Sequence, residues 1–185
     1  MTDTPITTVE AKAWCRVEVA DDDTLIGGLI TAASDYLLNT YGIVCATSSH
    51  VLSFDAFADR IPLYRSPMVR VTTVSYTASD GTETVLASDQ YRLRKHHGVS
   101  VLQPAYGVTW PATECIDGAV TVTVSAGYAN NAAVPEAIRT AALLLVAHWY
   151  DNRAAVVVGS TTHELALAVD DLVRPYRTVL LVYWR

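Results

Sequence analysis

The first segment of the chain alternates apolar and polar residues at the spacing of an amphipathic helix. Thr7 and Glu10 stand three positions apart, the spacing of a capping box, in which each side chain satisfies a backbone amide at the start of a helix. We therefore expect a helix over about residues 7–19. Its apolar stripe consists of Ala11, Trp14, Cys15 and Val19.

A second helix is expected over residues 24–41. The acidic run Asp21–Asp23 precedes it, and carboxylates at that position cap a helix and favour the positive end of its dipole. Gly27 and Gly28 each cost about 1 kcal/mol of helix stability relative to alanine, so we expect another backbone to pack closely there. Gly42 then ends the helix. The apolar side is broad and consists of Leu25, Ile26, Leu29, Ile30, Ala32, Ala33, Tyr36 and Leu37.

Between residues 46 and 127 the hydrophobic period changes from helical to alternating. His50, Leu52 and Phe54 occupy every second position, which predicts a strand buried on one side. The segment Ser79–Thr82 contains Asp-Gly, a strong signal for a β-hairpin. We expect a compact antiparallel β-rich unit inserted between helices. Further short strands are expected at Val69–Tyr76, Thr84–Leu86, Tyr91–Leu93, Val99–Leu102 and Val120–Val124.

Helical periodicity returns at Pro135, a favourable first residue of a helix, and predicts a helix over residues 135–153. Thr161 and Glu164 again have capping-box spacing. A last helix is expected over residues 166–175, followed by an apolar tail over residues 178–185. The apolar side of the third helix consists of Ile138, Ala141, Ala142, Leu145 and Trp149.

These elements predict an α+β fold, an antiparallel bundle of about four helices with an inserted β-rich antiparallel unit. At 185 residues the chain suits one domain, and because it is 51% hydrophobic and 17% charged it can bury a sizeable core. The longest apolar run, Ala141–Ala147, is too short to span a bilayer. Met1–Thr4 has no basic region followed by an apolar run, so we expect no secretory signal, no membrane association and synthesis in the cytoplasm.

The cysteines and the acidic run do not predict a metal site. Cys15, Cys45 and Cys115 are odd in number and widely spaced, so buried reduced thiols are expected. Asp21–Asp23 lacks the spacing and the central glycine of a calcium loop. The adjacent pair His96–His97 on a predicted turn would direct its two rings apart, whereas a metal site needs converging ligands.

The chain also lacks a P-loop, a dinucleotide fingerprint and a nucleophile elbow. His148 shares a helix face with Asp151 and Asn152, but the sequence gives this group no nucleophile. A packed histidine is the favoured interpretation, and a small enzyme using His148 and Asp151 is the less favoured one. Asp170–Asp171 are expected either on a solvated face or in ion pairs with Arg174. We expect no enzyme and no cofactor.

The formal net charge of −6 disfavours a sequence-specific DNA-binding module, which normally carries a basic face. It is compatible with a wall past which DNA slides, because phosphate contacts supply most non-specific affinity and an acidic lining repels phosphate.

Ten stretches, spread over nearly the whole chain, together follow a known order and spacing. They are Thr8–Ile26, Ile61–Leu63, Ser66–Pro67, Val71–Tyr76, Asp89–Leu93, Trp110–Pro111, Gly118–Tyr128, Val134–Arg139, His148–Arg153 and Leu172–Arg177. In this order the chain resembles the phage head–tail connector family, the adaptor proteins that sit below the portal, with counterparts in gene transfer agents. Similar proteins often stop soon after Pro175–Arg177, whereas this one continues to Arg185.

The resemblance implies a structural protein of the virion neck, made in a bacterial cytoplasm and assembled into a ring, dodecameric to match the portal. Such a ring extends the DNA channel, lets double-stranded DNA pass without sequence-specific binding, and joins the portal to a stopper or tail-completion protein. The alternative within the neck is that the chain is itself a stopper or tail-completion ring. The residues of the family-signature helix end are His148, Trp149, Tyr150, Asn152 and Arg153.

The apolar tail allows two interpretations. It has β propensity and follows a proline, so it suits either the chain's own final strand or a segment that docks on a partner as an added strand or as aromatic anchors. In the second case the partner is the portal or a neighbouring subunit. The residues that would bind it are Val179, Leu180, Leu181, Val182, Tyr183, Trp184 and Arg185.

Overall fold

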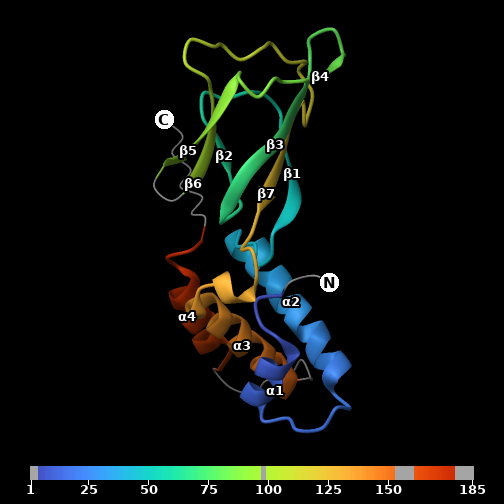
Figure 1. The fold of residues 1–185 in the computed structure, drawn as a ribbon, viewed down its shortest axis with the longest axis vertical. Coiled ribbons are helices and arrows are strands. Elements are labelled where there is room, and N and C mark those ends of the chain that lie inside the picture. Colours follow the sequence, from blue (N-terminus) through green and yellow to red (C-terminus); the bar gives the residue numbers. More distant parts are fainter. Residues whose placement is uncertain (1–3, 97–98, 153–160, 178–185) are drawn as a thin grey trace. The chain divides into compact units, whose positions relative to one another are not determined.

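The computed structural model describes residues 4–96, 99–152 and 161–177 (Figure 1). Its contacts cluster into two compact units. The helical unit comprises the described residues up to Thr47 together with those of Tyr128–Arg177, and the β unit comprises the described residues of Ser48–Gly127. The α+β class with a β-rich segment between helices is thus confirmed. The expectation of one domain over residues 1–185 stays a prediction.

The helical unit contains four α-helices within its described residues. A short 3-10 turn, η1 (Asn131–Ala133), precedes the third of them. None of the described helices is both long and apolar enough to cross a membrane. The helices are α1 (Thr8–Cys15), α2 (Asp23–Tyr41), α3 (Glu136–Asp151) and α4 (Thr161–Val173).

Helix α1 begins where the sequence predicted and ends earlier. The capping box is present, since the amide of Glu10 donates to Thr7 Oγ1 at 3.2 Å and the amide of Thr7 donates to Glu10 Oε2 at 2.7 Å. The helix ends at Cys15 because Arg16 adopts a left-handed conformation with φ 57°. The prediction of a helix to residue 19 is therefore wrong. Val19 lies beyond the helix.

Two expectations about α2 are also corrected. Asp22 is the N-cap residue, but its side chain makes no capping hydrogen bond. A Cβ atom built at Gly27 or Gly28 would meet no other atom within 4 Å, so no other part of the described chain packs closely there. Gly42 ends the helix as expected, in a left-handed conformation with φ 69° that glycine adopts without strain.

The last two helices differ slightly from their predicted limits. Pro135 is the N-cap residue of α3, which begins at Glu136, and its predicted end at residue 153 lies outside the described residues. Helix α4 begins at Thr161 rather than at residue 166. It ends at Val173, since the residue before a proline disfavours helical backbone and Pro175 follows closely.

The core of the helical unit draws on all four helices. In α2 the innermost part of the predicted apolar side is buried, whereas Leu25 and Ala32 are exposed. Trp14 of α1 was also predicted in the apolar stripe and is 47% exposed. The buried side chains of the helices are Ala11, Ile26, Ile30, Ala33, Leu37, Tyr41, Ile138, Ala141, Ala142, Leu145, Val146, Val169 and Val173.

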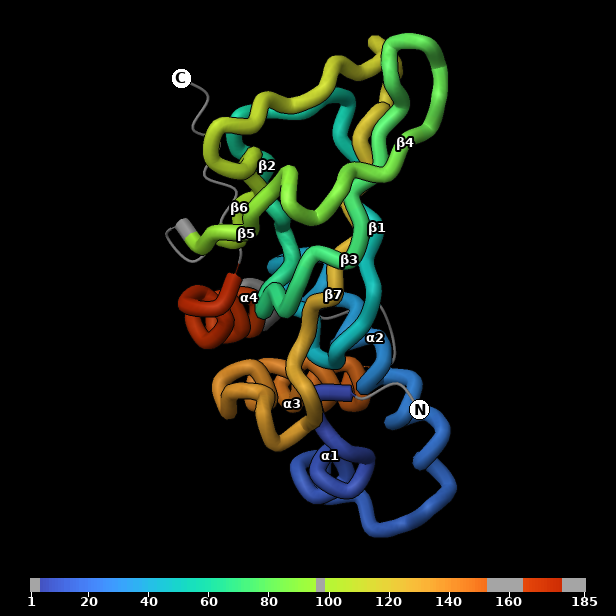
Figure 2. The backbone as a smooth tube through the Cα atoms, turned by 45° about the horizontal axis from the view of Figure 1, so that its top comes forward, coloured from blue at the N-terminus to red at the C-terminus, as the bar shows by residue number. Residues whose placement is uncertain are grey.

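The β unit consists of two antiparallel sheets (Figure 2). One has the strand order β1-β7-β3-β4 and the other the order β2-β6-β5. The strands are β1 (Ser48–Phe54), β2 (Ile61–Leu63), β3 (Met68–Thr77), β4 (Glu83–Val85), β5 (Tyr91–His96), β6 (Val99–Pro104) and β7 (Val120–Ala126).

Strand β7 lies between β1 and β3, and its side chains alternate strictly between buried and half-buried. Val120, Val122 and Val124 are fully buried, while the hydroxyl-bearing residues between them are half-buried. Because side chains alternate across a strand, one side of the four-stranded sheet faces the core of the β unit and the other carries Ser and Thr. Strand β1 follows the predicted pattern, with Leu52 half-buried and Val51 64% exposed.

The predicted hairpin joins β3 to β4. The amide of Ala78 donates to Thr82 O at 2.9 Å, and Asp80 Oδ1 accepts the amide of Thr82 at 2.9 Å. Gly81 has φ 81°, a backbone conformation that a side chain disfavours. The Asp-Gly signal therefore located this turn correctly.

Candidate functional site

The C-terminal end of α3 is the part of the predicted signature that the structure describes. Asn152 caps the helix, because its backbone N–H donates to His148 O at 3.0 Å and its side-chain Nδ2 donates to the same oxygen at 2.9 Å. Nδ2 also lies 3.3 Å from His148 Nδ1. An amide N–H only donates, so Nδ1 is the acceptor in this contact. The partner of His148 is thus Asn152, not Asp151.

Trp149 packs against the core of the helical unit. Its ring meets Tyr36 edge-on, with centroids 6.2 Å apart, and Tyr36 in turn meets Tyr41 edge-on at 6.1 Å. Burial raises the pKa of Tyr41 to about 12. The inward position expected for Trp149 is confirmed, and this aromatic row joins α3 to α2.

Tyr150 connects the same helix end to the start of α2. Its hydroxyl donates to Asp22 Oδ2, the carboxylate that was expected to cap α2. Arg139, near the start of α3, pairs with Glu10 of α1 and lies 3.2 Å from Glu136. The amide of Thr7, followed by its hydroxyl and Arg139, lowers the pKa of Glu10 against the opposing effect of burial. These contacts give α3 a structural role.

The two cysteine thiols of the helical unit have raised pKa values. Burial, with the nearby Asp151 carboxylate, raises the pKa of the Cys15 thiol, so Cys15 is a poor nucleophile. Burial likewise raises the pKa of Cys45 to about 12. Cys115 is exposed, which corrects the expectation of a buried thiol, since it lies in the long connection between β6 and β7.

Among the described residues no group of three or more His, Cys, Asp or Glu side chains is placed to hold a metal ion. His96 ends β5, and His97 lies outside the described residues. Asp170 and Asp171 pair with Arg174 at 3.6 and 2.6 Å, the second of the two alternatives expected for them.

Replacing His148 by leucine is expected to lower the free energy of unfolding by about 0.5–1.5 kcal/mol, because the hydrogen bond to Asn152 is lost while the helix cap remains. Urea denaturation of the purified protein measures this change. Asp151→Asn is the control and should change stability by less than about 0.5 kcal/mol, since Asp151 is exposed. A stable His148→Leu protein that selectively lost its function would instead support catalysis.

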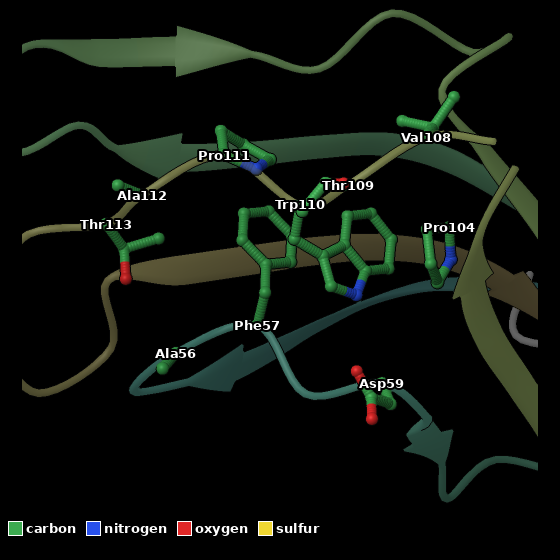
Figure 3. Close-up of a pocket in the computed structure, with 10 residues that line it drawn as sticks. All are labelled: Ala56, Phe57, Asp59, Pro104, Val108, Thr109, Trp110, Pro111, Ala112 and Thr113. Atoms are coloured by element: carbon green, nitrogen blue, oxygen red, sulfur yellow. The ribbon is translucent and has the colours of Figure 1, made fainter.

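The β unit contains an aromatic pocket that the sequence pattern did not single out. Phe57 stacks on Trp110 with ring centroids 4.5 Å apart and an interplanar angle of 11°. Trp110 Nε1 donates to Ala58 O at 2.8 Å. The adjoining cavity, of about 500 Å³, opens beside this pair (Figure 3). Its lining residues are Ala56, Phe57, Asp59, Pro104, Val108, Thr109, Trp110, Pro111, Ala112 and Thr113.

The residues around the pocket are best explained as structural, because they hold the connection between β6 and β7 in place. The stack and the indole hydrogen bond hold that connection against the segment after β1. Asp59 is the single charged residue of the lining. The pair Trp110–Pro111 was the sequence signal available, but its partner Phe57 is remote in the chain.

The remaining predicted site residues lie outside the described residues. These are Arg153 and the tail Val179–Arg185. Their assignment to partner binding therefore stays a prediction.

The fold defines the class of protein: an α+β chain in which a β-rich unit is inserted between the helices of a bundle. The sequence model of the head completion protein family matches residues 5–184. The chain therefore belongs to the head completion protein family. This membership confirms the resemblance drawn from its sequence. No curated protein matches the sequence.

Solved structures share the fold over nearly the whole chain. A chain from the neck of an empty GTA particle, computed with C6 symmetry, superposes with a TM-score of 0.77 at 22% identity, covering 98% of this chain and 93% of that one. A chain from the virion of a native gene transfer agent gives 0.76 at 21% identity, covering 97% and 92%. A chain from the neck of a native GTA particle, computed with C12 symmetry, gives 0.67 at 21% identity, covering 100% and 99%.

Proposed function

We propose that the chain is the adaptor of a particle neck, a ring that sits beneath the portal and joins the head to the stopper or tail. The observation that carries this proposal is the match of the head completion protein family to residues 5–184. The shared fold with chains from the necks of GTA particles supports it. The C6 and C12 symmetries printed for those necks are both compatible with twelve copies, so we propose a dodecamer.

A ring of identical chains needs two different surfaces on each copy. Every contact joins one surface to another on the next copy, and the ring closes when the rotation between copies suits. The net charge of −6 fits a ring through which DNA passes, because phosphate is not drawn to an acidic wall. The role is structural, without catalysis or a cofactor.

The tail Val179–Arg185 is proposed to dock on the portal or on a neighbouring subunit. Val179–Trp184 combines apolar residues with two aromatic ones. Aromatic side chains supply much of the binding energy when they fill pockets of a partner. Docking also removes the aggregation hazard of a free apolar segment.

Deleting Thr178–Arg185 is expected to leave a folded protein that no longer joins particles. The deleted and full-length chains would each be supplied to heads made from the same genome without this gene, and joined protein would be quantified on purified particles. Circular dichroism and urea denaturation verify folding. A matched control replaces the apolar residues of Val179–Trp184 by serine and threonine, which keeps the length and should fail equally. Normal joining by either variant would refute the docking role.

The location of the chain in the particle distinguishes the adaptor from the alternative, a stopper or tail-completion protein. A label on this chain should appear directly beneath the portal in particle images. A label found below another neck ring would favour the alternative, since both kinds of ring share the channel and differ in position.

A further inference from the structure

Exposed apolar side chains lie on and beside the connection between α1 and α2, a segment that can be followed in Figure 1. Trp14, Val19 and Leu25 are 47%, 58% and 40% exposed. Tryptophan is among the residue types enriched at the energetic centres of interfaces, and neighbouring exposed apolar side chains mark interaction surfaces. We call Trp14, Glu18, Val19, Asp21 and Leu25 the α1–α2 corner.

Bonds within the helical unit fix the backbone of this corner. Lys12 Nζ pairs with Asp23 Oδ1 at 2.6 Å. The amide of Val17 donates to Lys12 O at 2.9 Å, and that of Asp23 donates to Ala20 O at 3.1 Å. A surface fixed before binding loses less conformational freedom when a partner arrives. The corner is therefore preorganised for a contact.

The corner is also acidic, because the segment between Trp14 and Leu25 has four acidic residues and one basic residue, Arg16. Glu18 and Asp21 are exposed and have no ion-pair partner among the residues that the structure describes. The described part of the helical unit has eleven acidic and five basic residues, a net charge of −6, whereas that of the β unit has seven and six, a net charge of −1. A partner of the corner should therefore be basic.

The β unit carries such a surface at one edge of its smaller sheet. Strand β5 is an edge strand, paired only to β6 in the described sheet. Arg94 and Lys95, which we call the basic edge, are exposed on opposite faces of this strand and also have no ion-pair partner within the described ranges. Beyond the other end of the β5–β6 ribbon, Tyr106 is 94% exposed. The basic edge thus complements the corner in charge.

We propose that the α1–α2 corner of one copy binds the basic edge of the next copy, and that this pair of surfaces forms part of the ring contact. The inference rests on the proposed ring. Each copy contributes one surface to each neighbour, as a heterologous contact requires. Unpaired opposite charges set the register, while Trp14 and its apolar neighbours supply buried area.

A second copy fits the corner better than DNA does. The carboxylates of Glu18 and Asp21 repel phosphate, and an exposed tryptophan gains most from an apolar or cationic protein surface. Charged residues on an edge strand also prevent strands of different molecules from pairing. The experiment must therefore separate a copy-to-copy contact from DNA binding and from protection of the edge.

Two charge reversals test the contact. The corner variant is Glu18→Lys with Asp21→Lys, and the edge variant is Arg94→Glu with Lys95→Glu. In each variant the two surfaces have the same sign, so each alone should join heads lacking this gene at least about tenfold less well than the unmodified chain. An equal mixture should recover joining, because copies alternate around a ring of even number and every contact is again attractive.

The matched controls reverse exposed charges elsewhere, Asp35→Lys in the helical unit and Arg60→Glu in the β unit. Both should join like the unmodified chain. The chain carrying all four reversals should also join, since its corner is basic and its edge acidic. Circular dichroism of every variant verifies folding.

Each other outcome has a distinct meaning. If the unmodified chain itself did not join the heads, the proposed function would fail. If both variants joined normally, only this inference would be overturned. Loss of joining in the edge variant without recovery in the mixture would also overturn the inference. If that variant had also lost salt-dependent affinity for DNA, the basic edge would be a DNA contact. If the variant aggregated, the two charges would serve to protect the edge strand.

Discussion

Replacing Leu37 by alanine is expected to lower the free energy of unfolding of the helical unit by about 2–5 kcal/mol, because the cavity left by a deleted buried side chain collapses only partly. Leu37 is fully buried in the core that the four helices share. Urea denaturation followed by circular dichroism measures the loss. Hydrogen exchange resolved along the chain assigns it to the helical unit.

The control is Leu25→Ala on the same helix. Leu25 is 40% exposed, so its truncation should cost less than about 1 kcal/mol. Equal effects of the two substitutions would contradict the orientation of α2. A large effect of Leu25→Ala in the isolated protein would show that the α1–α2 corner belongs to the core, which would also remove the basis of the proposed copy-to-copy contact.

Replacing Val122 by aspartate is expected to unfold the β unit, at a cost of more than about 4 kcal/mol. Val122 is fully buried in the central strand β7, opposite Leu52 of β1 and Val74 of β3. A carboxylate there loses its hydration and finds no cation among these neighbours. Hydrogen exchange along β1, β3 and β7 should rise throughout.

The matched control lies one residue away. Thr123→Asp places the same carboxylate on the other side of β7, where Thr123 is half-buried and pairs with Val51 and Thr73. We expect a cost of about 1 kcal/mol or less. If Thr123→Asp were the more harmful change, the register of β7 would be shifted by one residue, since a one-residue slip exchanges the two sides of a strand.

The elements that the sequence predicted well depend on neighbours in the chain. The capping box of Thr7 and Glu10, the hairpin turn at Gly81 and the helix end at Gly42 each join residues a few positions apart. Such signals keep their meaning whatever the rest of the fold does. The alternation of β7 likewise follows from the period of a strand.

The features that the sequence missed depend on remote partners. The hydroxyl that binds Asp22 belongs to Tyr150, 128 residues away, and Trp110 bonds to Ala58 across 52 residues. No local pattern contains such pairs. Trp14 misled for another reason: its position in an apolar stripe indicated burial, but α1 is short and ends at Cys15. A large apolar residue beside the end of a short helix is as well placed for a partner as for the core.

Gly27 and Gly28 show a related limit. No backbone of the described residues packs closely against them. The two glycines therefore indicated space beside α2 but not what occupies it. The stretch His148–Asn152 is similar: the resemblance to the family drew on it, while the structure shows its atoms in the cap of α3.

The chain leaves the helical unit at Thr47 and returns at Tyr128, and these two residues are bound to each other. The amide and the hydroxyl of Thr47 both donate to Tyr128 O, at 3.0 and 2.9 Å. The β unit is thus an insertion whose two ends lie side by side in the helical unit. Closing a long insertion adds little entropy cost over closing a short one. We therefore expect that a longer or shorter insertion at this position would leave the packing of the helices unchanged.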